Sequence, residues 1–307
     1  MNRPACVLAV SIAASFGQAA GPRTLQPDPP MKCDNCDDWN QPREAFHVFG
    51  NTYYVGVAGV SAVLIASDAG LILVDGALTQ SAPLIDRNIR KLGFKTEDIK
   101  LIVNGHSHYD HAGGINALQR FSGAKVATSH VAVRALLEGV PTRDDPQAGF
   151  TGNGFPPIEN VQGVADDEVL RLGDLAITAH ATPGHTPGGT TWSWRSCEGA
   201  RCLDIVYADS LSAVATPGYR FTGDATHSSV VESFRRSIAK VSQLPCDIMI
   251  GAHPFVSDLD GKVERRAKQP AGPNPFIDAG ACRALAADAL KGLEARIAEE
   301  NGKETKR

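Results

Sequence analysis

The sequence has little of several features that would place it outside the ordinary globular proteins. Aromatic residues make up only 6% of its 307 positions, and no apolar run is long enough to span a bilayer. The 30 basic and 34 acidic residues give a net charge of −4, and the basic residues form no stripe of the kind that binds nucleic acid. Because 43% of the residues are hydrophobic and 21% are charged, disorder, collagen and coiled coil are excluded. We therefore expect a globular protein without a nucleic-acid or membrane partner.

The first 19 residues differ in character from the rest of the chain. Arg3 precedes an apolar stretch from Ala5 to about Phe16, and small residues follow up to Ala19. This order is typical of a secretory signal peptide, so residues 1–19 are predicted to be removed on export. The alternative, an N-terminal core helix, is disfavoured because a polar segment rich in Pro and Gly follows at once.

Six cysteines remain once Cys6 is set aside with the signal, and an even number in an oxidising compartment suggests three disulfides. Cys197 and Cys202 flank a turn-like EGAR, which favours a local Cys197–Cys202 bridge. A Cys246–Cys282 bridge would tie a C-terminal helix to the body of the protein.

The remaining pair, Cys33 and Cys36, is a Cys-x-x-Cys in the N-terminal lead-in, residues 20–38. Such a pair can be a redox couple or half of a zinc site. The sequence lacks a second Cys-x-x-Cys, which favours a structural Cys33–Cys36 disulfide.

Strand-like and helix-like periods alternate along residues 39–300, which predicts a single layered α/β domain of two half-sheets, followed by a frayed tail at 301–307. Strands are expected at 47–57, 60–67, 70–76, 101–106, 124–129, 169–182, 188–196, 203–212 and 247–253. Helices are expected at 81–94, 111–123, 130–139, 227–244 and 281–300. The stretch 140–161 has no period and is long enough to suggest a functional loop.

The chemistry is concentrated in the segment HSHYDH, which follows an apolar strand. Residues two apart in an extended segment point to the same side, so His106 and His108 can meet one ion. Asp110 and His111 come next, in a turn where they can face a neighbouring position. Four metal-binding side chains in six residues would be costly to bury without a metal, so this segment predicts a metal site rather than a solvated loop.

Two further histidines follow strands in the same way, His185 in TPGHTPGG and His253 in GAHP. Each alone would be read as a surface or core histidine, but beside HSHYDH they complete the donors of a binuclear site. The other histidines of the mature chain are interpreted as structural or surface groups: His47, His130, His180 and His227.

These segments together resemble the metallo-β-lactamase superfamily. HSHYDHAGG, ATPGHTPGG, YADSLSA and GAHP occur in this order between about Trp39 and Ala298, and they are most similar to class B, subclass 3. The resemblance implies an α/β fold, a four-layer αβ/βα sandwich with two zinc ions in the groove between its sheets. It assigns His106, His108 and His185 to the first zinc and Asp110, His111 and His253 to the second. Residues 209–212 contain no cysteine ligand, which is typical of subclass 3.

Zinc suits this donor set, because neutral imidazoles and one carboxylate are its ordinary ligands. A zinc ion with three histidines keeps a place for water and makes hydroxide available near neutral pH. We expect a metal-bound hydroxide to attack the β-lactam carbonyl and Asp110 to orient it. The implied enzyme is a monomeric periplasmic metallo-β-lactamase acting on small molecules (penicillins, cephalosporins and carbapenems), and it confers antibiotic resistance.

Further residues receive roles from the resemblance or from position. Ser210 and Ser212 lie two apart at an expected strand end and, by resemblance, bind the drug's carboxylate; ordinary strand serines are the alternative. Thr186 is expected to contact the substrate or the metal ligands, or else to cap a turn. Asp75 looks like the buried aspartate that braces the metal loop of the superfamily. Apolar substrate contacts are expected from Phe150 and Phe155, and core packing from Trp192 and Trp194.

Two alternatives stay open. One is another dizinc hydrolase of the same fold, a hydroxyacylglutathione thioesterase or a lactonase, in which an aspartate near Asp209 bridges the metals. We expect Asp209 to point away, because neighbours on a strand face opposite sides. The other is a non-catalytic zinc-binding or adhesion protein, which a three-histidine site with room for water argues against.

Overall fold

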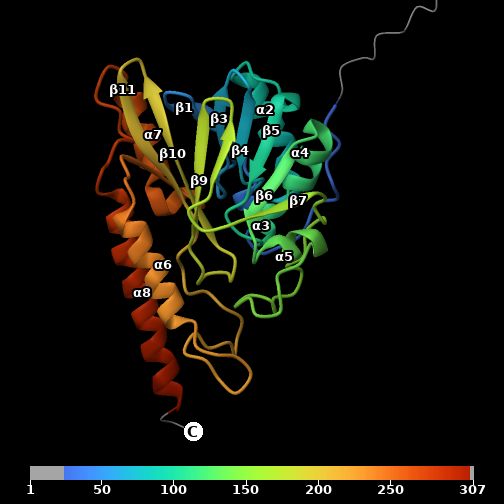
Figure 1. Ribbon diagram of the computed structural model, residues 1–307, viewed down its shortest axis with the longest axis vertical. Coiled ribbons are helices and arrows are strands. Elements are labelled where there is room, and N and C mark those ends of the chain that lie inside the picture. The colour runs from blue at the N-terminus through green and yellow to red at the C-terminus, as the bar shows by residue number, and fades with distance from the viewer. Residues whose placement is uncertain (1–23, 305–307) are drawn as a thin grey trace, which may run out of the picture.

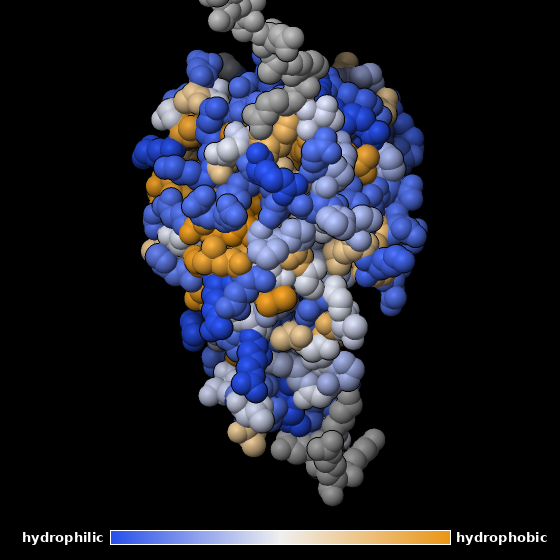
Figure 2. All heavy atoms as spheres, turned by 90° about the vertical axis from the view of Figure 1, so that its right-hand side faces the viewer, coloured by the Kyte–Doolittle hydropathy of each residue, from blue (hydrophilic) through white to orange (hydrophobic). Residues whose placement is uncertain are grey.

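The structure is a computed structural model that describes residues 24–304, so the expected signal at 1–19 lies outside the described residues. Two β-sheets face each other at the centre and helices cover their outer faces (Figure 1). Figure 2 shows mostly hydrophilic side chains on the face that carries α2 and α4, with apolar groups gathered in patches between them. Between residues 24 and 304 no helix is long and apolar enough to cross a bilayer.

The first sheet has seven strands in the order of the sequence, antiparallel from β1 to β4 and parallel from β4 to β7. Its strands are β1 (Phe46–Phe49), β2 (Thr52–Tyr54), β3 (Val63–Ser67), β4 (Gly70–Val74), β5 (Ile99–Val103), β6 (Lys125–Ser129) and β7 (Val161–Val164). The helices of this half are α1 (Cys36–Trp39), α2 (Ala82–Lys91), α3 (Tyr109–Ala112), α4 (Ile115–Ser122) and α5 (Val133–Glu138), with short 3₁₀ turns η1 (Thr79–Ser81) and η2 (Thr96–Asp98).

The second sheet has five strands in the order β12-β11-β10-β9-β8, and only the β11–β12 pair is parallel. Its strands are β8 (Val169–Leu172), β9 (Leu175–Ala181), β10 (Thr190–Glu198), β11 (Arg201–Ala208) and β12 (Ile248–Gly251). The helices of this half are α6 (Val231–Gln243), α7 (Leu259–Lys268) and α8 (Ala281–Glu304), with the 3₁₀ turn η3 (Pro254–Ser257). Helices α6 and α8 run side by side (Figure 1).

Strands with two buried faces explain the four layers. In β4, Leu71 and Leu73 join the core beneath α2 and α4, whereas Ile72 and Val74 join the core between the sheets. The same alternation in β11 divides its side chains between the intersheet core and the core beneath α6 and α8. Successive strand residues point to opposite faces, so continuous apolar strands are what a sheet covered on both faces requires. The expected αβ/βα sandwich is confirmed.

The structure divides several expected elements at glycines. The helix expected at 111–123 is two helices, α3 and α4, separated by Gly113 and Gly114. A Cβ at Gly114 would collide with the carbonyl oxygen of Gly76, so the Gly-Gly pair lets the chain pass close to the segment after β4.

Two helices of the second half differ from the sequence-based expectation. Helix α7 has a highly polar sequence and is not among the expected helices. Helix α8 continues to Glu304, past the expected end at 300.

The six cysteines of the described chain lie in three pairs. The sulfur–sulfur distances are 2.17 Å for Cys33–Cys36, 2.01 Å for Cys197–Cys202 and 2.07 Å for Cys246–Cys282. These are the pairs expected from the sequence. The third pair joins the segment before β12 to the first turn of α8, which fixes the start of this long helix against the second sheet.

Candidate metal centre

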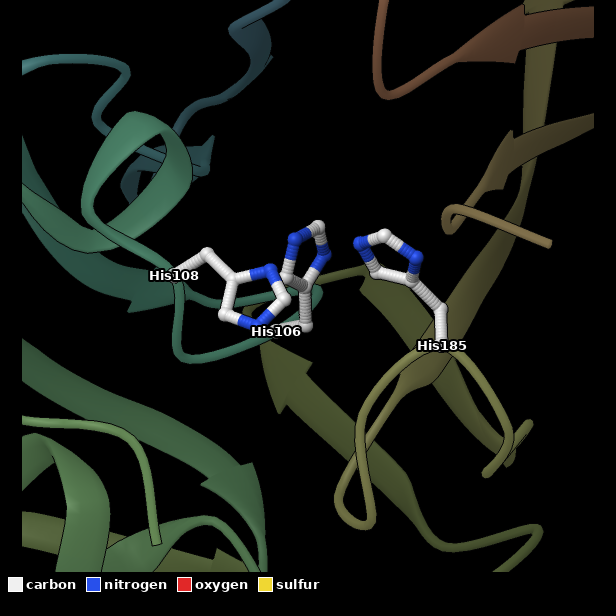
Figure 3. Close-up of side chains that lie close together, drawn as sticks. All are labelled: His106, His108 and His185. Carbon is white, nitrogen blue, oxygen red and sulfur yellow. The ribbon is translucent and has the colours of Figure 1, made fainter. Parts of the chain in front are cut away.

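The candidate site lies where strands of both sheets end. His106, His108, Asp110 and His111 follow β5, and His185 and His253 follow β9 and β12. Because loops at the carboxyl ends of parallel strands meet at one edge, residues far apart in sequence come together there. Figure 3 shows the rings of His106, His108 and His185 gathered around one space.

In the first group of donors, each histidine uses one ring nitrogen to bind the protein. His106 Nδ1 donates to Asp209 Oδ1 at 2.7 Å, and His108 Nε2 donates to Asp145 Oδ1 at 3.0 Å. His185 Nδ1 donates to the carbonyl oxygen of Ser212 at 2.9 Å. The group offers one ligand atom from each of His106, His108 and His185, all within 4.8 Å of one another. The outer contacts thus fix the tautomer of each ring and turn its second nitrogen toward the space that the three rings share.

A second group lies beside the first and shares His106 with it. His106, Asp110 and His111 also offer ligand atoms within 4.8 Å of one another. His253 Nε2 is 3.4 Å from Asp110 Oδ2 and 3.4 Å from His111 Nε2, while its Nδ1 donates to the carbonyl oxygen of Gly59 at 2.8 Å. The structure therefore brings together all six residues that the resemblance assigns to two metals.

Asp75 braces this second group from beneath. Its Oδ1 accepts hydrogen bonds from Asn104 Nδ2 at 3.0 Å and Gly105 N at 2.7 Å. Its Oδ2 accepts one from the Tyr207 hydroxyl at 2.7 Å and one from His111 Nδ1 at 3.2 Å. Asp75 is fully buried and contacts His111 on the side away from Nε2, as expected for a residue that orients a ligand.

The charges of the site suit a cation. Burial holds the pKa of His106 well below its usual range and lowers that of His185 to about 3, which keeps both imidazoles neutral. Burial also disfavours a charged His111, but the carboxylates of Asp110 and Asp75 outweigh it and raise the pKa of His111 to about 10. The same pairing holds the pKa of Asp110 below its usual range against the effect of burial. Neutral imidazoles beside carboxylates that attract positive charge are a donor set that fits divalent metal ions.

The expectation that Asp209 points away from the site is wrong. Residue 209 lies just past β11, and its fully buried side chain turns toward the site to bind His106. The Asp209 carboxylate binds His106 at Nδ1, the ring nitrogen that faces away from the cluster. Asp209 is in neither group of candidate metal ligands found within residues 24–304. Burial and the nearby Asp75 carboxylate raise the pKa of Asp209 well above its usual range. Its place is that of a residue that positions His106.

The residues expected to bind substrate divide into two sets. Ser210 and Ser212 lie in the loop after β11 instead of on the strand, and Ser212 Oγ is 3.1 Å from His185 Nδ1. Phe150 is exposed and shares a cavity of about 330 Å³ with His108, Tyr109 and Gln147.

The other residues that received roles lie outside this cavity and outside the loop after β11. Phe155 is buried in the core beneath α2 and α4, so its expected place in a substrate wall is wrong. Thr186 lines a different cavity with Tyr219 and His227, and its buried hydroxyl has no hydrogen-bond partner among the described residues. Trp192 and Trp194 lie in the intersheet core, as expected.

The four histidines interpreted as structural lie outside the cluster. His180 bridges Asp167 and Ser193 by its two ring nitrogens, at 2.9 and 2.7 Å. His227 stacks on Tyr219. His47 contacts the carbonyl oxygen of Gly50, and His130 packs over Gly163.

Sequence reasoning missed two residues that contact histidines of the cluster, Asp145 and Gln147. Both lie in the loop 140–161, which the absence of any period had marked as functional. Asp145 accepts a hydrogen bond from His108 Nε2 and orients that ring, whereas Gln147 Nε2 lies 3.3 Å from His185 Nε2, the ring nitrogen that faces the cluster. Their roles depend on the path of this loop across the site, which the local sequence pattern does not encode.

A glycine fixes the loop that carries His185. Gly184 has φ of +155°, and a Cβ there would collide with the ring of Phe234 in α6. Only glycine lets the loop lie this close to the helix, so α6 sets the position of the neighbouring His185.

Comparisons with known proteins agree with this geometry. A family model described as the metallo-beta-lactamase superfamily matches residues 55–253. The structure of MEM-A1, a subclass B3 metallo-beta-lactamase from a soil metagenome library, is 48% identical with a TM-score of 0.83, over 87% of this chain and 100% of that one. BJP-1, a subclass B3 metallo-beta-lactamase of Bradyrhizobium japonicum, is 32% identical with a TM-score of 0.79, over 88% and 99% of the two chains.

The curated relatives match a smaller part of this chain than the solved structures do. The N-acyl homoserine lactonase AttM of Agrobacterium fabrum is 32% identical over 121 residues, which are 34% of this chain and 42% of the lactonase. The match thus spans less than half the length of that relative. The family model and the high coverage of the solved structures decide the assignment: this chain belongs to the metallo-β-lactamase superfamily and, within it, to the subclass B3 metallo-β-lactamases.

Proposed function

We propose that this protein hydrolyses the amide bond of β-lactams, including penicillins, cephalosporins and carbapenems, with two zinc ions, and so confers antibiotic resistance. His106, His108 and His185 would hold one ion, and Asp110, His111 and His253 the other. One observation carries the proposal. In five histidines of the cluster one ring nitrogen binds a carboxylate or a carbonyl, so that the second nitrogen is left for the cluster.

The chemistry divides between the metals and the chain. Bound zinc supplies a water ionised near neutral pH and a Lewis acid for the carbonyl oxygen. The chain positions the reactants. The ionised carboxylate of Asp110 accepts a hydrogen bond from the attacking water and orients it toward the lactam carbonyl carbon. Hydrolysis then adds the hydroxyl group to this carbon and a proton to the lactam nitrogen as the bond between them breaks.

The substrate's carboxylate fixes its orientation. Ser212 is exposed and contacts His185, and Ser210 lines a groove with Ser212 and His253, so both hydroxyls can donate to a carboxylate near the cluster. The acyl side chain then extends toward the cavity that Phe150 and Gln147 share with His108. These contacts bind and orient the drug, and no serine acts as a nucleophile.

Hydrolysis of nitrocefin and meropenem by purified protein, with and without a chelator, tests the proposal. We expect zinc-loaded protein to hydrolyse both, chelation to abolish activity and added zinc to restore it. His108→Ala and Asp110→Ala should remove the activity, whereas His130→Ala, outside the cluster, should retain it. Full hydrolysis by metal-free protein would refute the proposal.

A lactonase activity is the second candidate, because curated N-acyl homoserine lactonases match part of the chain. In a site of that kind an aspartate at the position of Asp209 would bridge the metals, but here Asp209 binds the far side of His106. Asp209→Asn should therefore keep both zinc ions by elemental analysis and lose activity through a misoriented His106. Loss of one zinc equivalent in this variant, with faster turnover of a homoserine lactone than of nitrocefin, would favour the lactonase.

We further propose that the protein works in the periplasm as a monomer. The signal-like residues 1–19 and the three cysteine pairs support export, because disulfides persist in oxidising compartments. N-terminal sequencing of protein from a periplasmic extract, with size-exclusion chromatography, tests both statements.

A further inference from the structure

A second groove begins at the candidate site and reaches helix α8. It has a volume of about 350 Å³. Ser210, Ser212 and His253 line it on the side of the metal centre, and Leu285 and Ala289 line it from α8. The groove is therefore continuous with the site where we place the substrate.

The groove exposes apolar side chains that a folded protein would otherwise bury. Phe255 is 69% exposed, Val214 48% and Val256 39%, and all three line it. The Phe255 ring stacks on His253 with centroids 5.2 Å apart and an interplanar angle of 22°. Exposed apolar surface gathered beside a reaction centre is typical of a place where an apolar part of a ligand binds.

Helix α8 presents one face to this groove. Leu285, Asp288, Ala289 and Gly292 follow the spacing of residues on one side of a helix. Ala289 has only a methyl group and Gly292 has no side chain, so the groove is open on this face of α8. A Cβ added at Gly292 meets no atom within 4 Å. The exposed carboxylate of Asp288 disfavours an anionic occupant.

The chemistry of β-lactams indicates the occupant. In penicillins, cephalosporins and carbapenems, the ring carbon next to the carbon that bears the carboxylate carries a further substituent. If Ser210 and Ser212 bind the carboxylate, this substituent must lie close to them and so to the groove, because both serines line it.

We infer that the groove between the 209–214 loop, Phe255 and α8 binds this substituent and selects β-lactams in which it is large and apolar. The inference rests on the proposed β-lactamase function. It makes Phe255 a specificity residue and gives α8, whose sequence holds no metal ligand, a direct part in substrate choice.

Nitrocefin and cefalotin form a suitable pair, because they share one acyl side chain and differ at this substituent, which is a large styryl group in nitrocefin. Gly292→Phe fills the groove without replacing a contact. We expect it to lower kcat/KM for nitrocefin by about tenfold and to change that for cefalotin little. Gly302→Phe is the matched control, because Gly302 is equally open on the same helix but does not line the groove, and it should change neither value.

Phe255→Ala gives an independent measurement, with zinc content confirming that His253 is undisturbed. We expect KM to rise for nitrocefin more than for cefalotin. Equal effects of Gly292→Phe on both substrates, or no effect on either, would overturn the inference and leave the β-lactamase function standing. If zinc-loaded wild-type protein hydrolyses neither substrate, the proposed function itself fails and the inference fails with it.

Discussion

Asp145 Oδ1 lies 3.0 Å from His108 Nε2, and both side chains are buried. The two residues come from different parts of the chain, since His108 follows β5 and Asp145 belongs to the long loop between α5 and β7. The same carboxylate oxygen accepts a hydrogen bond from the amide of Gln147 at 2.7 Å. The loop thus orients an imidazole of the candidate metal centre through one aspartate.

Asp145→Ala should weaken zinc binding about 10- to 100-fold, because loss of a residue that orients a metal ligand typically costs this much. His108 would keep its nitrogen but lose the contact that fixes its tautomer. Competition with a chromophoric chelator measures the affinity. Asp144→Ala is the matched control, because Asp144 is exposed and adjacent to Asp145. The zinc affinity of this variant should equal that of the wild type. Equal loss in both variants would show that the loop as a whole, and not the Asp145 carboxylate, supports the site.

The Asp75 carboxylate should be required for folding as well as for metal binding. Asp75 has φ of +59°, a conformation that asparagine tolerates better than alanine, and its carboxylate satisfies four donors. We expect Asp75→Ala to reduce the free energy of unfolding by about 3 kcal/mol or more, through unsatisfied buried donors and backbone strain. Asp75→Asn should cost less. Urea denaturation of the metal-free proteins measures both, and equal losses would contradict the backbone argument.

Much of the cluster could be predicted because four of its six residues lie in one short motif after a strand, and the other two also follow strands. The spacing of His106 and His108, and the positions of His185 and His253 after apolar strands, predict that these side chains meet, without knowledge of the tertiary structure. The cysteine pairs also follow from local turns and from the start of a helix. The buried strands were visible because apolar residues run through both of their faces.

The residues that sequence reasoning missed are held by tertiary contacts. Strand alternation predicts that the Asp209 side chain points away from the cluster. However, β11 ends at Ala208, so Asp209 does not follow this alternation and its side chain binds His106. Phe155 looked like a loop residue and is buried, because the loop folds back over the core near α5. Helix α7 has no clear apolar stripe, since it packs at an edge of the intersheet core with few side chains.

The two disulfides beyond the lead-in should differ in their contribution to stability. Cys246–Cys282 closes a loop with a sequence separation of 36, against 5 for Cys197–Cys202. In the loop-entropy treatment, the longer loop contributes about 2 kcal/mol more. Denaturation of the double Cys→Ser variants of each pair tests this. A larger loss from the Cys197–Cys202 pair would show that β-hairpin geometry outweighs loop length.

Glu300 links the C-terminal helix to the loop that follows β11. Its Oε1 accepts hydrogen bonds from Phe221 N at 3.0 Å and Arg296 Nε at 2.8 Å, and its Oε2 accepts them from the amide and hydroxyl of Thr222 at 2.9 and 2.8 Å. Burial alone would raise the pKa of Glu300, but these donors outweigh it and lower the pKa from its ordinary value of 4.5.

A carboxylate whose pKa is lower in the folded than in the unfolded state stabilises the fold above the unfolded pKa, and the effect is lost as the pH falls through the folded pKa. We expect Glu300→Gln to reduce the free energy of unfolding by about 2 kcal/mol at neutral pH, because charged hydrogen bonds are lost. The difference from wild type should shrink as the pH falls below about 4.5, since protonation removes the same charge from the wild type. Glu264→Gln, at an exposed residue that pairs with Lys268 on α7, should cost less than about 0.5 kcal/mol at every pH. A Glu300→Gln deficit that stays constant down to pH values of about 3 would show that packing, and not the charge on Glu300, holds the loop to α8.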